Sequence, residues 1–375
     1  MAERCRILLL SRYGKLGASS RLRLFQYIPF IEQTGIEVVV APFFDDDYLK
    51  HLYTTRKRRI NDVLISYKRR LSAVKSARKY SVVWIEKEIF PFLPDWFENM
   101  IIRSGVPYVI DYDDAIFHNY DQHHLAIVRG LLGKKLDQLL AKSKCITVGN
   151  NYLGSYVYSH GAIDVRRIPT VVDIRRFDVA EEPDSKELRI GWIGSPATTK
   201  YLYNVRDALK RLNAERLVRL VTIGASPLGD YGVPLEQHPW SEADEARLLS
   251  SIHVGIMPLP DNPWEQGKCG YKLIQYMACG RPVVASPVGV NRDMVTEAVG
   301  YLADGTDDWV QSLRTFRDNP EHRRVCGHAG RRLVEREYSL QITAPHVVSI
   351  LREAANMSSG VHTAYVAVPK DSGRS

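Results

Sequence analysis

The sequence predicts an α/β protein made of two doubly wound, Rossmann-like domains that face each other across a cleft. Two observations support this prediction. At 375 residues the chain is too long for one ordinary hydrophobic core, and two domains of about 170–190 residues are the natural division. Short apolar segments also alternate with segments of helical periodicity, and this alternation starts afresh halfway along the chain.

The first half of the chain contains short apolar segments that alternate with helical patterns. We expect strands at Cys5–Ser11, Ile36–Ala41, Ser81–Ile85, Pro107–Asp111 and Cys145–Val148. Alternation of this kind is typical of a parallel sheet whose crossover connections are helices. A charged stretch with a proline, Ala180–Lys186, follows these segments. We therefore place the first domain at residues 1–178.

The second half repeats the same pattern. We expect strands at Leu188–Ile193, Leu217–Ile223, His253–Met257 and Pro282–Ala285, and helices at Thr198–Leu212 and Tyr271–Cys279. The residues from Asp307 to about Ala355 have a wholly helical pattern. We place the second domain at residues 187–338. A helix at 339–356 is expected to cross back to the first domain, and the tail 357–375 is expected to be disordered.

Composition narrows the class of protein. The chain is 45% hydrophobic and 25% charged, as in globular proteins, and no apolar run approaches the ~18 residues that span a bilayer. The N-terminus lacks a secretory signal pattern. The five cysteines are odd in number and form no C-x-x-C pair, which favours reduced thiols over disulfides or a zinc site. We therefore expect a cytoplasmic protein.

The positive charge of the chain is concentrated in residues 50–79. This segment holds eleven lysines or arginines and one acid, Asp62, a net charge of +10, whereas the whole chain carries +8. Apolar residues recur within it at helical spacing, which predicts an amphipathic helix. They are Leu52, Ile60, Val63, Leu64, Tyr67, Leu71 and Val74.

Three interpretations of this basic helix compete. It could be a solvated surface, it could lie on an anionic membrane, where each basic residue contributes about 1 kcal/mol, or it could bind nucleic acid. Interleaved aromatic residues and a known motif are absent, which argues against nucleic acid. We expect the segment to dock on the cytoplasmic leaflet of the plasma membrane, with the protein peripheral to it.

The segment Val254–Asn291 is the most informative part of the chain. It has the pattern strand, polar loop, helix, tight turn and strand, and its loop places Lys268, Gly270 and Lys272 at the start of the helix. Loops at the carboxyl end of a parallel sheet are where α/β folds bind phosphorylated ligands. The pattern is typical of a nucleotide-diphosphate-sugar site.

The two lysines of this loop stand at an unfavourable place. Lysines early in a helix oppose the helix dipole, at a cost of about 0.3–1 kcal/mol, and a diphosphate between Lys268 and Lys272 would reverse the sign of this effect. Gln275 follows one turn later, roughly along the same face. The alternative is that both lysines are simply solvent-exposed.

Two further loops have the pattern of strand-to-helix turns. In the second domain, Ser195 and Pro196 are a favoured N-cap and first helical residue, and Gly194 lets the backbone approach a ligand. An ordinary well-capped turn is the alternative. In the first domain, the loop from Gly14 to Gly17 differs from the G-x-G-x-x-G of nicotinamide enzymes, which argues against a dehydrogenase.

Three carboxylates end the strand Pro107–Asp111, namely Asp111, Asp113 and Asp114. A D-x-D pattern could hold a divalent metal for a nucleotide. Short acidic triplets are, however, common at the ends of strands. We expect no metal here.

The chain resembles the GT-B glycosyltransferases, specifically the retaining enzymes of glycosyltransferase family 4, known as group 1. The resemblance is strongest from Tyr276 to Ser286, YMACGRPVVAS, where the family usually has E-A-M-A-C-G-x-P-V-V-A-S. The residues TVVD at 170–173, with Phe177, resemble the family's segment between the two domains, N-G-V-D-x-x-x-F. The similarity continues to Glu335–Ser339.

The chain departs from the family pattern at the E-x7-E pair. The pair aligns with Gly267 and Gln275, and Glu265 lies two residues from the first position. The family's Arg and Lys on the first loop of the second domain are also incomplete, with Trp192 or its neighbours in place of the Arg and Lys200 as the candidate Lys. We expect the two lysines at 268 and 272 to take over the diphosphate.

The resemblance implies roles for individual residues. It places Asp113 at the family's cleft histidine, so Asp113 and Lys272 are the catalytic candidates. The candidates for donor binding are Gly14, Gly17, Gly194, Ser195, Gly224, Glu265, Lys268, Gly270 and Gln275. The amides of Gly194 and Ser195 are expected to bind the diphosphate together with the lysines, and Gln275 the ribose. No metal and no other cofactor is expected.

The resemblance also implies a reaction. We expect transfer of a sugar, with retention, from a UDP- or GDP-sugar to a glycan or lipid-linked acceptor in the assembly of cell-surface polysaccharide such as lipopolysaccharide. No nucleic acid partner is expected. Two alternatives remain open at this point, a catalytically silent GT-B subunit or adaptor and a GT-B nucleotide-sugar epimerase.

Overall fold

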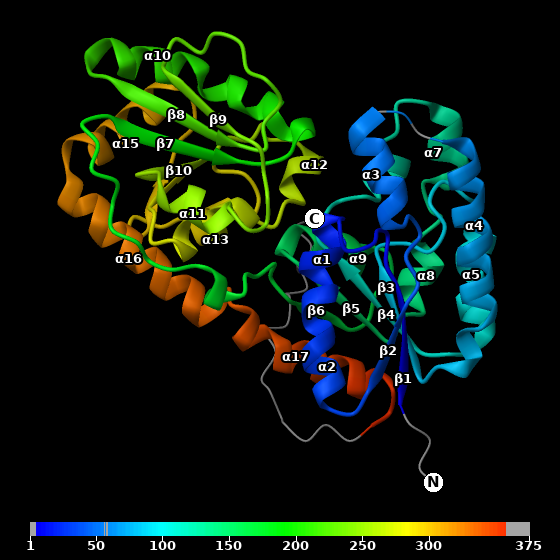
Figure 1. Cartoon of the computed structure of the whole chain (residues 1–375). Coiled ribbons are helices and arrows are strands. Elements are labelled where there is room, and N and C mark those ends of the chain that lie inside the picture. The colour runs from blue at the N-terminus through cyan, green and yellow to red at the C-terminus, as the bar shows by residue number, and fades with distance from the viewer. Residues whose placement is uncertain (1–4, 56, 58, 358–375) are drawn as a thin grey trace, which may run out of the picture. The chain divides into compact units, whose positions relative to one another are not determined.

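The computed structural model describes residues 5–55, 57 and 59–357, and the chain divides into two compact units (Figure 1). The first unit runs to Thr170 and takes in the residues from Thr343 onward, and the second is Val171–Ile342. The first range expected from the sequence ends at residue 178 and the second begins at 187, so both lie beyond the boundary between Thr170 and Val171. Except for Met357, the tail at 357–375 lies outside the described residues.

The first unit is built on a parallel sheet of six strands in the order β2-β1-β3-β4-β5-β6. Its strands are β1 (Arg6–Leu10), β2 (Glu37–Val40), β3 (Val82–Glu86), β4 (Tyr108–Tyr112), β5 (Cys145–Val148) and β6 (Val165–Arg167). Every residue of β3, β4 and β5 is buried, as the apolar runs predict for a sheet covered on both faces. The order changes direction between β1 and β3, so the two loops after these strands diverge there.

Helices surround this sheet. They are α1 (Ala18–Arg23), α2 (Ile28–Gln33), α3 (Asp46–Thr55), α4 (Ile60–Lys75), α5 (Asp95–Ser104), α6 (His118–Asp121), α7 (Ala126–Leu132), α8 (Asp137–Ala141), α9 (Asn151–Ser159) and, from the C-terminal part of the chain, α17 (Leu340–Ala354). From Thr343 onward α17 packs on the first unit, where Tyr27 Oη lies 3.2 Å from Thr343 Oγ1. Arg166 also forms an ion pair with Glu353 at 2.8 Å.

The basic segment differs from its prediction in two respects. It forms two helices, α3 and α4, in place of one. The inward face of α4 consists of Ser66, Arg70 and Val74, whereas Ile60 and Leu64 are 76% and 55% exposed. Helical periodicity locates an amphipathic face, but the packing of the whole unit decides which face turns inward, and here part of the apolar face is left in solvent.

The second unit has a parallel sheet of six strands in the order β12-β11-β10-β7-β8-β9. The strands are β7 (Leu188–Ile193), β8 (Val218–Ile223), β9 (Leu235–His238), β10 (Val254–Met257), β11 (Val283–Ala285) and β12 (Gly300–Leu302). The order reverses between β7 and β10, the first and fourth strands of this unit. In open α/β sheets ligands bind outside the carboxyl ends of the strands at this reversal.

Helices cover both faces of the second sheet. They are the 3₁₀ helix η4 (Pro196–Val205), α10 (Arg206–Glu215), α11 (Glu245–Ser250), α12 (Pro263–Gln266), α13 (Tyr271–Ala278), α14 (Asn291–Met294), α15 (Thr306–Asp318) and α16 (Pro320–Glu337). The single helix predicted at Thr198–Leu212 is therefore two, η4 and α10. The sequence analysis also missed β6, β9 and β12, which are edge strands of at most four residues and carry little periodicity.

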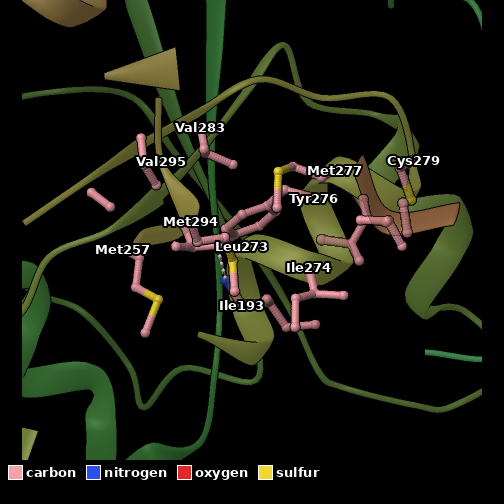
Figure 2. Close-up of a cluster of buried hydrophobic side chains, with 14 of the residues drawn as sticks. Ile193, Met257, Leu273, Ile274, Tyr276, Met277, Cys279, Val283, Met294 and Val295 are labelled. Atoms are coloured by element: carbon pink, nitrogen blue, oxygen red, sulfur yellow. Dashed lines mark hydrogen bonds between the residues drawn. The ribbon is translucent and has the colours of Figure 1, made fainter. Parts of the chain in front are cut away.

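Tyr276 of α13 bridges the neighbouring strands β7 and β10 at their carboxyl ends. The Ile193 N–H donates to the Tyr276 hydroxyl at 2.9 Å, and that hydroxyl donates to the Ile256 carbonyl at 3.2 Å. Figure 2 shows the ring within the apolar cluster that includes Leu273 and Met277. The hydroxyl thus pairs a backbone N–H and a carbonyl of two neighbouring strands, which are costly to bury unpaired.

None of the helices in the described ranges is long and apolar enough to cross a membrane.

Candidate functional site

Polar side chains gather at the carboxyl ends of the strands in both units. In the first unit they follow β1, β3 and β4, and in the second they follow β7 and β10 and continue through α12 and α13. The contacts within each group are formed by residues of a single unit.

In the first unit Asp113, the predicted catalytic carboxylate, lies next to a lysine that the sequence analysis missed. Lys87 Nζ is 2.6 Å from Asp113 Oδ1 and 3.6 Å from Asp114 Oδ2. Ser19 Oγ donates to Asp113 Oδ2 at 2.7 Å and accepts from Lys87 Nζ at 3.1 Å. Lys87 has φ +65°, a strained conformation for a side chain of this size, and such strain is common at functional sites.

Electrostatics keeps both members of this pair charged. Burial by itself raises the pKa of Asp113, but the positive charges of Lys87 and Arg23 outweigh burial and lower that pKa to about 2. Burial lowers the pKa of Lys87, and the charges of Asp113, Asp114 and Glu86 raise it above its ordinary value. Asp113 is therefore an anion at neutral pH, suited to accept hydrogen bonds from hydroxyl groups and unsuited to act as a general acid.

The other carboxylates at this edge are occupied by partners within the unit. Arg23 holds Asp111 through two hydrogen bonds of 2.9 and 2.6 Å. Glu88 accepts from Arg12 at 2.9 Å and from Lys135 at 2.8 Å. The D-x-D pattern is thus split, because Asp111 faces an arginine and Asp113 a lysine. Nowhere in the described ranges do three or more His, Cys, Asp or Glu side chains form a group that could hold a metal ion.

The backbone amides of Gly14 and Gly17, two predicted donor-binding residues, are hydrogen-bonded within the first unit. The Gly14 N–H donates to the Phe44 carbonyl at 2.9 Å, and the Gly17 N–H donates to the Gly14 carbonyl at 3.1 Å. Their lack of a side chain serves internal packing, since a Cβ on Gly14 would lie 2.3 Å from Asp46 Oδ1, and one on Gly17 would lie 2.3 Å from Tyr13 Cβ.

The Gly194 and Ser195 amides, predicted to bind the diphosphate, have hydrogen-bond partners within the unit. The Gly194 N–H donates to the Ile223 carbonyl at 3.0 Å, and the Ser195 N–H donates to Thr198 Oγ1 at 3.1 Å. A Cβ on Gly194 would lie 2.4 Å from Trp192 Cη2, so this glycine makes room for the indole of the same strand. The well-capped turn, the alternative interpretation, holds here.

Packing within the second unit also explains the glycine at position 224. Its φ is +76°, and a Cβ there would lie 2.4 Å from the Gly194 carbonyl oxygen. Its N–H donates to the His238 carbonyl at 2.9 Å. Gly224 thus allows the loops after β7 and β8 to approach each other, and its amide is occupied.

The lysines predicted to bind the diphosphate lie over tryptophan rings. Lys272 Nζ is 5.5 Å from the centre of the Trp192 ring, and Lys268 Nζ is 5.4 Å from the centre of the Trp264 ring. A ring face attracts an ammonium group and orients it without neutralising its charge. Both lysines are half-buried, within and just before the first turn of α13. Gly270 precedes α13 with φ +68°, and a Cβ there would press on Met294.

Glu265 lies deeper and has an unsatisfied oxygen. Asn262 Oδ1 caps the short helix α12 by accepting from the Trp264 and Glu265 N–H groups, both at 3.2 Å. The Tyr201 hydroxyl donates to Glu265 Oε1, while Glu265 Oε2 is buried without a hydrogen-bond partner. The residue is 4% exposed. An unsatisfied buried carboxylate oxygen is costly in a folded protein and calls for an explanation, such as a ligand hydroxyl.

Gln275 lies one turn beyond Lys272 on α13 and is 3% exposed. Its position agrees with the predicted face, but it is more deeply buried than a solvent-exposed helix face implies. The functional residues that the sequence analysis missed in this unit are Tyr201, which holds Glu265, and Trp264, which lies under Lys268. Tyr201 is 64 residues from Glu265 along the chain, so no local signal pointed to it. Trp264 lies close to Lys268 in the chain, within the loop that the sequence singles out.

Known proteins resemble this chain in sequence over part of its length. Residues 187–319 match the model of the family described as glycosyl transferases group 1. A GDP-mannose-dependent monoacylated alpha-(1-6)-phosphatidylinositol monomannoside mannosyltransferase of Corynebacterium glutamicum is 34% identical over 211 residues, 49% of this chain and 55% of that protein. The match thus spans about half the length of this relative.

Solved structures resemble the whole chain. HepE of Anabaena in complex with UDP has a TM-score of 0.68 at 12% identity and covers 93% of this chain and 100% of its own. Sucrose-phosphate synthase of Thermosynechococcus elongatus has a TM-score of 0.68 at 15% identity and covers 93% and 99%. At such identities the likeness shows the fold. Residues 187–319 are thus similar to the glycosyl transferases group 1 family, and the chain has the fold of the GT-B glycosyltransferases.

Proposed function

We propose that this protein is a glycosyltransferase that moves a hexose from a nucleotide-diphosphate donor to a glycan or lipid-linked acceptor, with retention at the anomeric carbon and without a metal ion. The observation that carries the proposal is the group after β7 and β10. Two ammonium groups lie over tryptophan rings there, 5.5 and 5.4 Å from the ring centres, and Glu265 beside them has a buried oxygen without a partner. Cations and one free acceptor suit a ligand with phosphates and hydroxyls.

Each residue has a role in this proposal. Lys268 and Lys272 bind the diphosphate, Gln275 bonds the ribose and Glu265 Oε2 accepts a hydroxyl of the donor sugar. Asp113, held as an anion by Lys87, accepts a hydroxyl of the sugar or of the acceptor. In the reaction the bond from the anomeric carbon to the diphosphate breaks as the acceptor oxygen attacks on the same face, and the acceptor proton passes to the leaving phosphate. Cations at the phosphate stabilise the charge that develops in the transition state.

Similarity supports a hexose donor. The corynebacterial relative is named for GDP-mannose and for a lipid-linked acceptor, and HepE is described with UDP and glucose. We propose a UDP- or GDP-hexose as the donor. We also propose an acceptor of the assembly of cell-surface polysaccharide, held at the cytoplasmic leaflet of the plasma membrane, where the basic segment 50–79 docks the enzyme.

The test combines ligand binding with turnover. The melting temperature is measured with UDP, GDP, ADP and CMP and with their sugars, with and without magnesium. A ligand at 100 times its Kd adds about 2.7 kcal/mol to stability, which shifts the melting temperature by several degrees. We expect a shift that is selective for one base and independent of magnesium.

The variant Lys272→Ala sharpens this test. It should abolish the shift and lower turnover at least tenfold without unfolding the protein, whereas Lys186→Ala, at an exposed position of the same unit, should change neither. Binding of a nucleotide sugar without transfer to any acceptor would favour a silent subunit. Free nucleotide released without a new glycoside would favour an epimerase, and no shift with any nucleotide would refute the donor site.

A further inference from the structure

Large apolar side chains are exposed in one stretch of the first unit. Among the described residues, ten such side chains are at least half exposed, and seven of them lie between residues 60 and 131. They are Ile60, Leu64, Ile65, Phe92, Trp96, Ile127 and Leu131. Scattered exposed apolar residues are normal, but a concentration of them marks an interaction site.

Helix α7 is the clearest case. Its sequence AIVRGLL is almost entirely apolar, yet Ile127 is 68% and Leu131 is 71% exposed, and Leu125, just before it, is 49% exposed. Only Leu132 at its end is buried. A helix of this composition would normally be covered by the rest of the protein. Exposed basic residues, Arg129 and Lys134, lie among and beside its apolar side chains.

Helix α4 presents a similar outer face. In its first half this face carries Ile60, Leu64 and Ile65, and in its second half it carries Lys68, Arg69 and Lys75, all of them exposed. Apolar and basic groups therefore follow each other along one helix. This is the pattern of helices that lie at the surface of an anionic membrane, where apolar groups enter the acyl boundary and basic groups remain with the headgroups.

The loop before α5 contacts α4 and also α6, the helix that precedes α7. The Tyr67 hydroxyl of α4 donates to the Pro91 carbonyl, and the Phe92 ring packs on Tyr120 of α6 at 5.4 Å between ring centres. Phe92 itself has φ +56° and is 52% exposed, so a strained backbone presents an aromatic side chain to solvent. In Figure 1, α4, α5 and α7 are drawn along the same side of the first unit.

We propose that α7, the first half of α4 and the loop at Phe92–Trp96 form a single surface that inserts into an anionic lipid bilayer. The exposed apolar groups alone would also suit a second copy of the chain. The charge decides between them. Lys68 and Lys75 of α4 are exposed, as are Arg129 and Lys134 at α7. Two copies of such a surface repel each other, whereas an anionic membrane attracts it. The surface deepens the proposed function, on whose lipid-linked acceptor it rests, and it gives the enzyme apolar anchors besides the basic segment.

The test uses the full chain with vesicles of phosphatidylcholine alone or mixed with phosphatidylglycerol. Co-sedimentation should be at least tenfold stronger with the mixed vesicles, and the double variant Ile127→Ser/Leu131→Ser should lose at least tenfold of it. Ile163→Ser is the matched control, because Ile163 is 76% exposed in the same unit but lies outside the surface. The three substituted side chains are solvent-exposed, so the double variant and the control should both fold.

The depth to which the surface inserts into the bilayer is measured by tryptophan fluorescence. Trp96 is 59% exposed, and phospholipids brominated on their acyl chains should quench its emission on binding. Trp96→Phe should remove most of this quenching. Vesicle binding that is independent of phosphatidylglycerol, or equal in the double variant and in wild type, would overturn the proposal. So would a dimer in solution that the double variant dissociates.

The result is separable from the proposed function. The double variant should keep the nucleotide-dependent melting shift and transfer to a water-soluble acceptor. Vesicle binding without any nucleotide binding would leave this surface in place and refute the transferase. Nucleotide binding and transfer without vesicle binding would refute the surface alone.

Discussion

The two units share a doubly wound sheet but treat polar groups at its carboxyl edge in opposite ways. In the first unit, buried carboxylates meet buried cations, with Arg23 on Asp111 at 2.6 Å and Lys87 on Asp113 at 2.6 Å. In the second unit, Lys272 lies over the Trp192 ring, and one oxygen of Glu265 is left without a partner. The second edge therefore presents a buried oxygen that can still accept a hydrogen bond, whereas the carboxylates of the first edge are paired with cations of the same unit.

The carboxyl edge of the sheet therefore serves a different purpose in each unit. Paired charges in the first unit hold a few groups in fixed orientation, and removing one partner exposes the full cost of burying the other. In the second unit, ring faces attract and orient the ammonium groups of Lys268 and Lys272. Substitutions at the two edges should therefore change the free energy of unfolding by different amounts.

The largest effect is expected for Lys87→Met. The Lys87 and Asp113 side chains are 5% and 12% exposed, so the substitution leaves a buried carboxylate without its cation and should lower the free energy of unfolding by about 3–5 kcal/mol. Urea unfolding followed by circular dichroism measures the loss. The double variant Lys87→Met/Asp113→Asn should recover a large part of it. A loss below about 1 kcal/mol would mean that the first edge is not held by paired charge.

The second effect concerns His253, which the second unit buries in its neutral form. Burial, with the nearby charge of Arg323, lowers the pKa of His253 from 6.5 to about 4. The unfolded chain therefore binds a proton at higher pH than the folded chain does. The free energy of unfolding should fall by about 3 kcal/mol as the pH drops from about 6.5 to 4.

The variant His253→Asn should flatten this dependence, because an amide can accept from the Arg189 N–H as the imidazole does at 2.9 Å. His124→Asn, at an exposed position, is the control and should retain it. Equal slopes for the two variants and wild type would show that the second unit does not keep this group neutral.

A smaller effect is expected for Tyr201→Phe. Without the Tyr201 hydroxyl, neither oxygen of Glu265 has a hydrogen-bond partner. Loss of a hydrogen bond to a charged group should lower the free energy of unfolding by about 1.5–3 kcal/mol. The neighbour Tyr203, 66% exposed, is the control, and Tyr203→Phe should be neutral. Unfolding measured with and without nucleotide sugar should show a smaller deficit with ligand, since a sugar hydroxyl then serves Glu265. An equal deficit in both conditions would argue against contact between Glu265 and the donor.

The smallest effect is expected for Gly194→Ala. The added Cβ would lie 2.4 Å from Trp192 Cη2, and overpacking of this kind costs about 1–3 kcal/mol. Gly229→Ala is the control, because nothing lies within 4 Å of the added methyl group. If Gly194→Ala were as stable as wild type but lost nucleotide binding, the glycine would serve the ligand and our assignment of its role to Trp192 would fall.

Much of the fold could be predicted from local signals. The alternation of apolar runs and helical patterns predicted two doubly wound units, and the structure confirms both sheets. The segment at 254–291 was predicted as strand, loop, helix, turn and strand, and it forms β10, α12, α13 and β11. These predictions hold because burial on both faces, helix periodicity and glycine at a turn act over a few neighbouring residues. The family resemblance, drawn from the same segment, is confirmed for residues 187–319.

The partners of the site residues could not be predicted. Ser19 and Asp113 are 94 residues apart in the chain, and Tyr201 and Glu265 are 64 apart. The order of the elements, the position of the lysine-bearing loop and the excess of charge in residues 50–79 follow from the amino-acid sequence. Folding was needed to show that the glycine amides are occupied, that Lys87 holds Asp113 and that α7 and half of α4 expose apolar groups. The reason is physical, since backbone pairing and charge compensation depend on which distant groups packing brings within hydrogen-bonding distance.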